Sequence, residues 1–237
     1  MISKINTPNL RELEQRFSNP ARRRLMVLLV RANLRLKHSF EFGVRRTWDV
    51  LAASLALVLG WPLWLLLALC IKLSDGGPIL YWQQRVGYRG QLFAFPKFRS
   101  MRIDADQCKS RLLNQHADQR TFKSRNDPRI TRIGRWLRRF SLDEVPQLWC
   151  VLKGEMTLVG PRPPLPNEVS LYGLHARQRL EITPGLTCIW QISGRSNIAF
   201  DGQLALDLKY IRERNIALDL RILLLTLPAV FRGHGAY

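Results

Sequence analysis

Two adjacent carboxylates, Asp143 and Glu144, are the residues best placed to do chemistry. They follow residues 127–142, where arginines alternate with apolar residues at helical spacing, which predicts a basic amphipathic helix. Two neighbouring acids beside arginines suit a magnesium-assisted reaction on phosphate, with one carboxylate as nucleophile or both near the metal. The alternative is a helix cap with surface charges, because Ser141 and Glu144 also match the capping pattern S-x-x-E.

The carboxylates are predicted to open a second helix, since apolar residues repeat at helical spacing from Val145 until Gly154. Pro146 favours a cap near Asp143 over one at Ser141, because proline is tolerated in the first turn of a helix and removes a hydrogen bond further in. Either cap places the acids where free N–H groups and the helix dipole favour anions.

The charge balance requires an anionic partner. The 237 residues include 37 Lys+Arg and 18 Asp+Glu, a net charge of +19, which indicates nucleic acid, anionic lipid or a phosphorylated substrate. The four cysteines form no C-x-x-C pair and have no neighbouring histidine, so neither a zinc site nor a disulfide framework is indicated, and free thiols are expected. These cysteines are Cys70, Cys108, Cys150 and Cys188.

A membrane anchor is predicted near the N-terminus. Residues 1–48 are basic and amphipathic, as in a segment on a membrane surface, and they lack the cleavage site of a secretory signal. No charged residue occurs from Val50 to Ile71, a run long enough to reach across a bilayer core. Basic residues flank both ends and Pro62 lies at the midpoint, so we expect a re-entrant helix over residues 49–72 that dips into one leaflet, with both termini facing the cytoplasm.

The rest of the chain, residues 73–237, is predicted to form one catalytic domain. A β-hairpin with turn signals at Gly87 and Gly90 is expected to end at Lys97-Phe98-Arg99. Residues 104–126 are polar and predict a surface helix or a loop. A short strand over 156–159 then leads to Arg162, which is fixed between two prolines and thereby preorganised for phosphate.

Later segments complete the predicted α+β fold. Residues 180–196 indicate a strand or extended loop, and helices are expected over 203–214 and 216–231. The fold expected is a membrane-anchored, mostly helical domain with a small β-hairpin and interfacial amphipathic helices.

Four stretches together resemble one known family over residues 45–237, the monotopic polyprenyl-phosphate phosphoglycosyl transferases among the bacterial sugar transferases. The stretches are KFRSM at 97–101, SLDEVPQLWCVLKGEMTLVGPRPPLP at 141–166, ITPGLTCIWQISGR at 182–195, and DLKYI with DLRILLLTLP at 207–228. Their common order makes the match more specific than a single motif. One departure is Trp61 before the kink proline, where many family members have serine.

The resemblance implies an activity. A sugar 1-phosphate would pass from a UDP-sugar to polyprenyl (undecaprenyl) phosphate, with release of UMP, through a covalent phosphosugar–aspartate intermediate and with Mg²⁺. This would be the first membrane step of exopolysaccharide, capsule, O-antigen or glycoconjugate assembly, on the cytoplasmic face of the bacterial inner membrane. The lipid bilayer would be a further partner, and the enzyme could form a homodimer.

The resemblance also implies residue roles. Asp143 would be the nucleophile and Glu144 its partner, and both would be magnesium ligands. Four basic residues would hold phosphate: Lys97, Arg99, Arg138 and Arg162. Weaker substrate roles would fall to Arg195 and Asp207.

Two other functions compete with this one. A membrane-tethered nucleic-acid-binding protein would explain the charge, but the sequence has no recognisable nucleic-acid motif, and its basic residues lie near the membrane segment and the acids. We therefore expect no nucleic-acid partner. A non-catalytic membrane scaffold would need the anchor and the basic helices alone. Such a scaffold has no use for the polar set Arg138, Asp143, Glu144 and Arg162.

Overall fold

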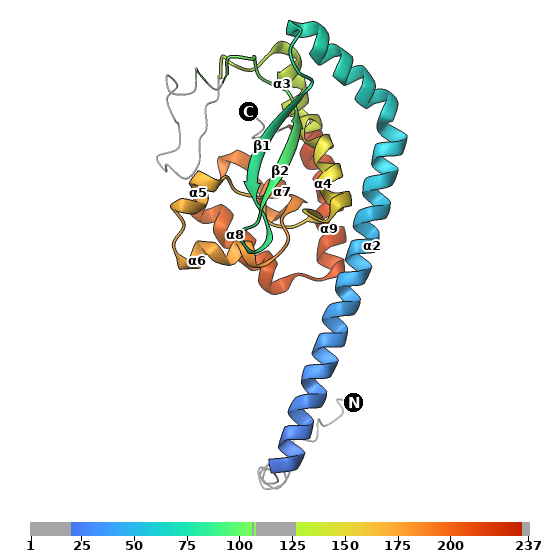
Figure 1. The fold of residues 1–237 in the computed structure, drawn as a ribbon, viewed down its shortest axis with the longest axis vertical. Helices are drawn as coiled ribbons and strands as arrows, with labels where there is room; N and C mark the ends of the chain where they lie inside the picture. The colour runs from blue at the N-terminus through green and yellow to red at the C-terminus, as the bar shows by residue number, and fades with distance from the viewer. Residues whose placement is uncertain (1–19, 106, 108–126, 234–237) are drawn as a thin grey trace, which may run out of the picture. The chain divides into compact units, whose positions relative to one another are not determined.

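A single helix, α2 (Pro20–Asp75), opens the part of the chain that the computed structural model describes, which is residues 20–105, 107 and 127–233. Pro62 lies inside α2 without interrupting it, and the helix bends where its colour passes from cyan to teal (Figure 1). Proline is a common cause of such bends because it removes a backbone hydrogen bond.

The second half of α2 has the character of a membrane helix. Phe40–Asp75 is long and apolar enough to cross a membrane, and only 6% of its most apolar stretch is buried. Leu59 and Trp61 expose 71% and 62% of their surface, whereas the core helix of a soluble protein would bury such side chains. The predicted apolar helix is therefore present, and its re-entrant path stays a prediction.

Helix α2 also belongs to the core of the domain that follows it. Two compact units divide the chain between Arg45 and Arg46. The boundaries expected at residues 48 and 72 stay predictions. Ala53 is fully buried in the main hydrophobic cluster, with Phe95 and Val151. Arg46 donates to the last carbonyls of helix α4 (Leu148–Lys153), where basic groups stabilise a helix C-terminus.

The predicted hairpin is confirmed. Strands β1 (Leu80–Val86) and β2 (Leu92–Phe98) pair antiparallel, with Leu80 opposite Phe98. The connecting turn η1 (Tyr88–Gly90) uses positive φ at Arg89 and Gly90, which glycine adopts without strain.

The helix before the carboxylates is also confirmed, but the predicted cap is wrong. Helix α3 (Arg132–Arg139) is capped by Thr131, whose side chain accepts from the Gly134 N–H. The acids then lie in a 3₁₀ helix, η3 (Leu142–Gln147), which contains Pro146. Ser141 has φ 54° and makes no capping bond, and Asp143 lies inside η3, so regular helix begins only with α4.

Two short parallel strands, β3 (Thr157–Val159) and β4 (Gly185–Thr187), organise the rest of the domain. The chain between them forms α5 (Pro166–Ser170), α6 (Leu174–Arg177) and η4 (Gln178–Glu181). The strand predicted in 180–196 is correct only for β4, because helices α7 (Ile189–Ser193) and η5 (Arg195–Asn197) follow it.

Helices α8 (Phe200–Glu213) and α9 (Ile216–Arg232) end the described chain and confirm the last two predicted helices. Asn215 caps α9 by accepting from the Leu218 N–H. The described chain is thus mostly helical, as predicted, and it carries the parallel β3–β4 pair in addition to the predicted hairpin. Three cysteines, Cys70, Cys150 and Cys188, are free as expected. Cys108 and most of the predicted segment 104–126 lie outside the described residues.

Candidate active site

A cavity of about 560 Å³ gathers most of the residues that the sequence singled out. Its walls come from β1, β2, α3, η3, α4, β3 and the turn after it, β4, α7, η5 and α9, so segments distant in sequence meet there. The predicted site residues that line it are Lys97, Arg138, Asp143, Glu144, Arg162 and Arg195.

Glu144 is held by two cations. Its Oε1 accepts from Arg162 Nη2 at 2.7 Å and from Lys97 Nζ at 3.2 Å. Burial by itself would raise the pKa of Glu144, but the charges of Arg162 and Lys97 outweigh it and hold the pKa well below its usual range. Glu144 is therefore a fixed anion that positions both cations.

Asp143 is in a different state. Its Oδ2 lies 3.9 Å from Lys97 Nζ, and within the described residues its side chain makes no hydrogen bond. Burial raises the pKa of Asp143, and the neighbouring Glu144 charge adds to this, although Lys97 opposes it. A carboxylate that is desolvated and free of hydrogen bonds is suited to act as a nucleophile, whereas Glu144 is suited to organise the site.

The hairpin contributes an arginine that sequence reasoning missed. Arg85 and Lys97 lie on one face of the β1–β2 pair, 5.2 and 5.5 Å from the centre of the Phe95 ring between them. Arg85 also donates to the Pro163 carbonyl at 3.0 Å, and burial, with help from the Arg162 charge, lowers the pKa of Arg85 to about 10. Period-two alternation combined with the hairpin register could have predicted this placement.

Arg138 and Arg195 complete the cationic lining. Arg138, in the last turn of helix α3, donates from its Nε to Ser100 Oγ at 2.9 Å, which fixes its guanidinium. Arg195 begins η5 in a left-handed conformation, φ 52°, that ordinary residues adopt at a cost and that often marks functional sites.

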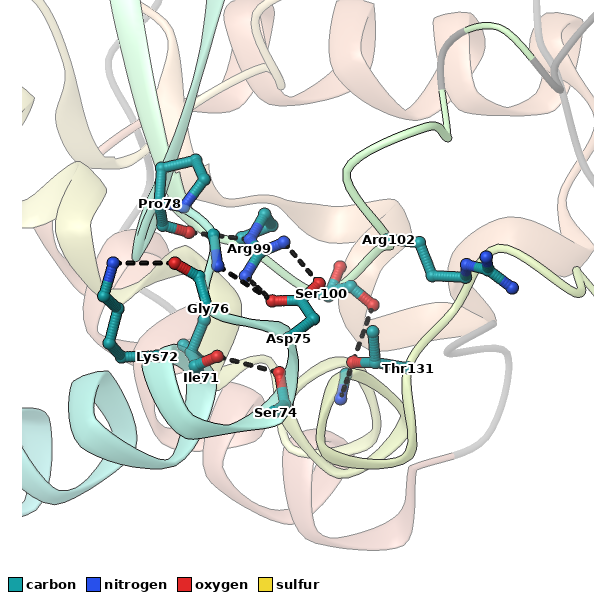
Figure 2. Close-up of polar contacts among 12 residues, drawn as sticks. Ile71, Lys72, Ser74, Asp75, Gly76, Pro78, Arg99, Ser100, Arg102 and Thr131 are labelled. Carbon is teal, nitrogen blue, oxygen red and sulfur yellow. Dashed lines mark hydrogen bonds and ion pairs between the residues drawn. The ribbon is translucent and has the colours of Figure 1, made fainter.

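Two predicted site residues lie outside this cavity. Arg99 is buried beside the end of α2, where it pairs with Asp75 and its Nε donates to the Pro78 carbonyl at 2.6 Å (Figure 2). This ion pair joins the end of α2 to the end of the hairpin. Asp207 is 1% exposed and lies 2.7 Å from Arg179 Nη2, while burial, opposed by Arg179, raises the pKa of Asp207 to about 6.

Another part of the cavity wall is mostly apolar, with Thr187 and Thr226 as its polar residues. Helix α9 supplies Leu223, Ala229 and Val230, and β4 supplies Leu186. Trp190 and Gln191 of α7 also reach the cavity. Sequence reasoning identified none of these as site residues, because a Leu-rich helix gives no signal of which neighbours it will face.

The acids could hold a metal only with help from a substrate. The described residues contain no group of three or more His, Cys, Asp or Glu side chains with metal-binding geometry. Magnesium is commonly held by one or two carboxylates together with substrate phosphates and water, so Asp143 and Glu144 fit that arrangement.

Comparisons with known proteins identify the family of this chain. The family model for bacterial sugar transferases matches residues 40–233, which include every residue of the cavity. The exopolysaccharide production protein ExoY of Rhizobium meliloti is 42% identical over 198 residues, covering 81% of this chain and 88% of ExoY.

Two longer relatives match through part of their length. The galactosyl transferase CpsE of Streptococcus agalactiae is 50% identical over 165 residues, covering 69% of this chain and 37% of CpsE. The undecaprenyl-phosphate galactose phosphotransferase of Salmonella typhimurium is 40% identical over 219 residues, covering 90% of this chain and 45% of that protein. The chain thus spans less than half the length of both. Since the family match extends over most of the sequence and the whole cavity, the chain belongs to the bacterial sugar transferase family.

Proposed function

We propose that this protein transfers a sugar 1-phosphate from a UDP-sugar to undecaprenyl phosphate and releases UMP. The observation that supports this proposal is the unequal pair of acids. Asp143 is desolvated and only loosely paired with Lys97 at 3.9 Å, whereas Glu144 is held at 3.2 Å by Lys97 and at 2.7 Å by Arg162. The Salmonella relative supports the reaction class, because it is named an undecaprenyl-phosphate galactose phosphotransferase. CpsE is named a galactosyl transferase and ExoY an exopolysaccharide production protein, which agrees with sugar transfer in polysaccharide synthesis.

The reaction proceeds in two displacements. Asp143 Oδ attacks the phosphorus that bears the sugar, and the bond to the bridging oxygen breaks, so UMP leaves with the electron pair. A phosphosugar remains on the carboxylate as a mixed anhydride. A phosphate oxygen of the lipid acceptor then attacks the same phosphorus, which forms the diphosphate-linked lipid sugar and regenerates the Asp143 carboxylate.

The basic residues neutralise the charge that these steps concentrate at phosphorus. Arg162, Arg138 and Lys97 surround the acids in a half-buried site, where cationic hydrogen bonds are stronger than in water. Magnesium, held by Asp143 and Glu144 with the substrate, would supply further neutralisation of the diphosphate.

The anchor brings this chemistry to its lipid substrate. The exposed apolar surface of α2 would lie in the bacterial inner membrane with the cavity on the cytoplasmic side. The apolar α9 wall would face the first isoprenoid units of the acceptor, because it is the part of the cavity without charged side chains.

The test uses enzyme, UDP-sugar and Mg²⁺ without lipid. We expect about one UMP per active site and a phosphosugar adduct in the intact-protein mass spectrum. Asp143→Asn should abolish the burst, the adduct and turnover, since an amide does not attack phosphorus. Asp104→Asn is the matched control, because Asp104 lies in an exposed ion pair 3.3 Å from Arg102. Active enzyme that shows neither burst nor adduct would establish direct transfer.

A further inference from the structure

A second, smaller cavity lies directly behind the phosphate-binding arginines. Its volume is about 180 Å³, and Arg85, Arg162 and Trp190 line both this cavity and the larger one. Sites for drug-sized ligands usually measure about 300–1,000 Å³, so this cavity suits one ring rather than a whole nucleotide sugar.

Aromatic side chains form much of its wall. Tyr172 and Phe200 are 5% and 1% exposed, and their ring centres lie 5.3 Å apart. The Arg179 guanidinium lies 5.9 Å from the Tyr172 ring and 5.8 Å from the Phe200 ring, so it is fixed among them. Broad, rigid rings of this kind can pack against the C–H faces of a saturated ring.

Polar groups in this wall have unused hydrogen-bonding capacity. Arg179 is 6% exposed, and its Nε has no acceptor among the residues that the structure describes. Gln203 donates to the Ile198 carbonyl at 2.8 Å, and within the same residues its Oε1 has no partner. Glu168 uses one carboxylate oxygen on the Leu165 N–H. Donors and acceptors are therefore both available, and leaving them unpaired when buried is unfavourable.

We propose that this cavity binds the sugar ring of the donor, and that Gln203 and Tyr172 help decide which sugar is accepted. The proposal rests on the proposed function and assigns a place for one part of its substrate. Hydroxyl groups both donate and accept hydrogen bonds, which matches the free groups of the wall.

The position of the cavity favours the sugar over the nucleoside. Arg162 belongs to both cavities and bonds to Glu144, so the smaller cavity begins beside the phosphorus that Asp143 attacks. The sugar is joined to that phosphorus through one oxygen, whereas a second phosphate separates it from the nucleoside. The α9 side of the larger cavity is mostly apolar, and its Thr226 hydroxyl is bonded to Thr187 at 2.8 Å, so it offers sugar hydroxyls fewer partners than the smaller cavity.

The experiment replaces Gln203 with leucine, which removes its hydrogen bonds and keeps a similar volume. Gln178→Leu is the control, because Gln178 is an exposed residue of η4 and does not line the cavity. Tyr172→Phe is a second test that removes a single hydroxyl and preserves the ring. UDP-glucose and UDP-galactose serve as probes, since they differ in the orientation of one hydroxyl, and UMP inhibition reports on the nucleoside. Melting temperatures show whether each variant is folded.

Gln203→Leu should lower kcat/KM for the preferred sugar about tenfold and alter the glucose-to-galactose ratio, as expected for the loss of a buried hydrogen bond to substrate. Tyr172→Phe should alter the same ratio, and the UMP inhibition constant should stay at the wild-type value in both variants. Equal weakening of UMP and of every UDP-sugar would place the nucleoside in the cavity and overturn the proposal. A folded Gln203→Leu protein with the same glucose-to-galactose ratio as Gln178→Leu would also overturn the proposal.

Binding to the non-reacting Asp143→Asn protein separates the two proposals. In one outcome, wild type releases no UMP, but adding Gln203→Leu to the Asp143→Asn protein alters the ratio of its affinities for UDP-glucose and UDP-galactose. The proposed reaction then fails and the sugar site stands. In the other outcome, wild type releases UMP normally, but neither Gln203→Leu nor Tyr172→Phe changes the glucose-to-galactose ratio. The sugar site alone then fails.

Discussion

Asp49 joins helix α2 to the strand that leads into the active site. Its carboxylate accepts from the Leu158 N–H at 3.0 Å and from Thr157 Oγ1 at 2.7 Å, and the residue is 8% exposed. Strand β3 continues directly into the turn that carries Arg162. We therefore expect Asp49 to hold the active-site turn in place relative to α2.

The size of its contribution follows from these two bonds. A hydrogen bond to a charged group contributes about 1.5–3 kcal/mol, and Asp49→Ala also leaves the Leu158 N–H buried without its acceptor, so we expect a loss of about 3–5 kcal/mol in unfolding free energy. For a chain of this size that corresponds to a fall of about 10 °C in Tm. Asp49→Asn keeps an acceptor for Leu158 and a donor for Thr157, so it should lose about half as much.

Apparent melting temperatures in one detergent and at one scan rate provide the assay, because membrane proteins often unfold irreversibly. Asp104→Ala is the control, since the exposed pair of Asp104 with Arg102 should contribute little. UMP release should fall in Asp49→Ala and recover in Asp49→Asn. If Asp49→Ala melts together with wild type and Asp104→Ala, the bonds to β3 do not stabilise the fold and the reasoning is refuted.

Arg162→Lys should lower kcat for UMP release about 10–100-fold despite keeping the charge, because an ammonium cannot reproduce the planar two-donor contact of a guanidinium, and wild-type kinetics would argue against a phosphate contact. Glu144→Gln should lower the maximal rate and move the acid limb of kcat/KM to lower pH. Burial keeps the pKa of Asp143 raised, but the substitution removes the part due to the Glu144 charge while Lys97 still opposes it. Activity needs ionised Asp143 and is lost as pH falls through its pKa, so an unmoved or higher limb would contradict this. Pro62→Leu should straighten α2 and favour a full span, which cysteine labelling of the two termini from each side of the membrane measures; unchanged topology and activity would place the break elsewhere.

Local patterns predicted much of the fold. Alternation with two glycines predicted the β1–β2 hairpin, and helical periodicity predicted α3, α8 and α9, because each element is selected largely by its own residues. The apolar run predicted a membrane helix, since length and absence of charge are properties of the sequence itself.

The same reasoning failed where a side chain chooses between local and distant partners. Ser141 and Glu144 match a capping box, yet Glu144 bonds to Arg162 and Lys97 from other elements, and Ser141 is left-handed. Two buried cationic bonds are stronger than one local cap, and only the folded chain brings those cations near.

The sequence by itself determined the acids, most of the arginines around them and the anchor that precedes them. The tertiary structure decided which charged residues meet at the cavity. Arg99 has the same chemistry as Arg162, but it pairs with Asp75 at the end of α2, whereas Arg85 reaches the site through the hairpin register. Residue type sets what a side chain can bind, and the packing of distant segments sets what lies within its reach, because each buried charge must find a partner.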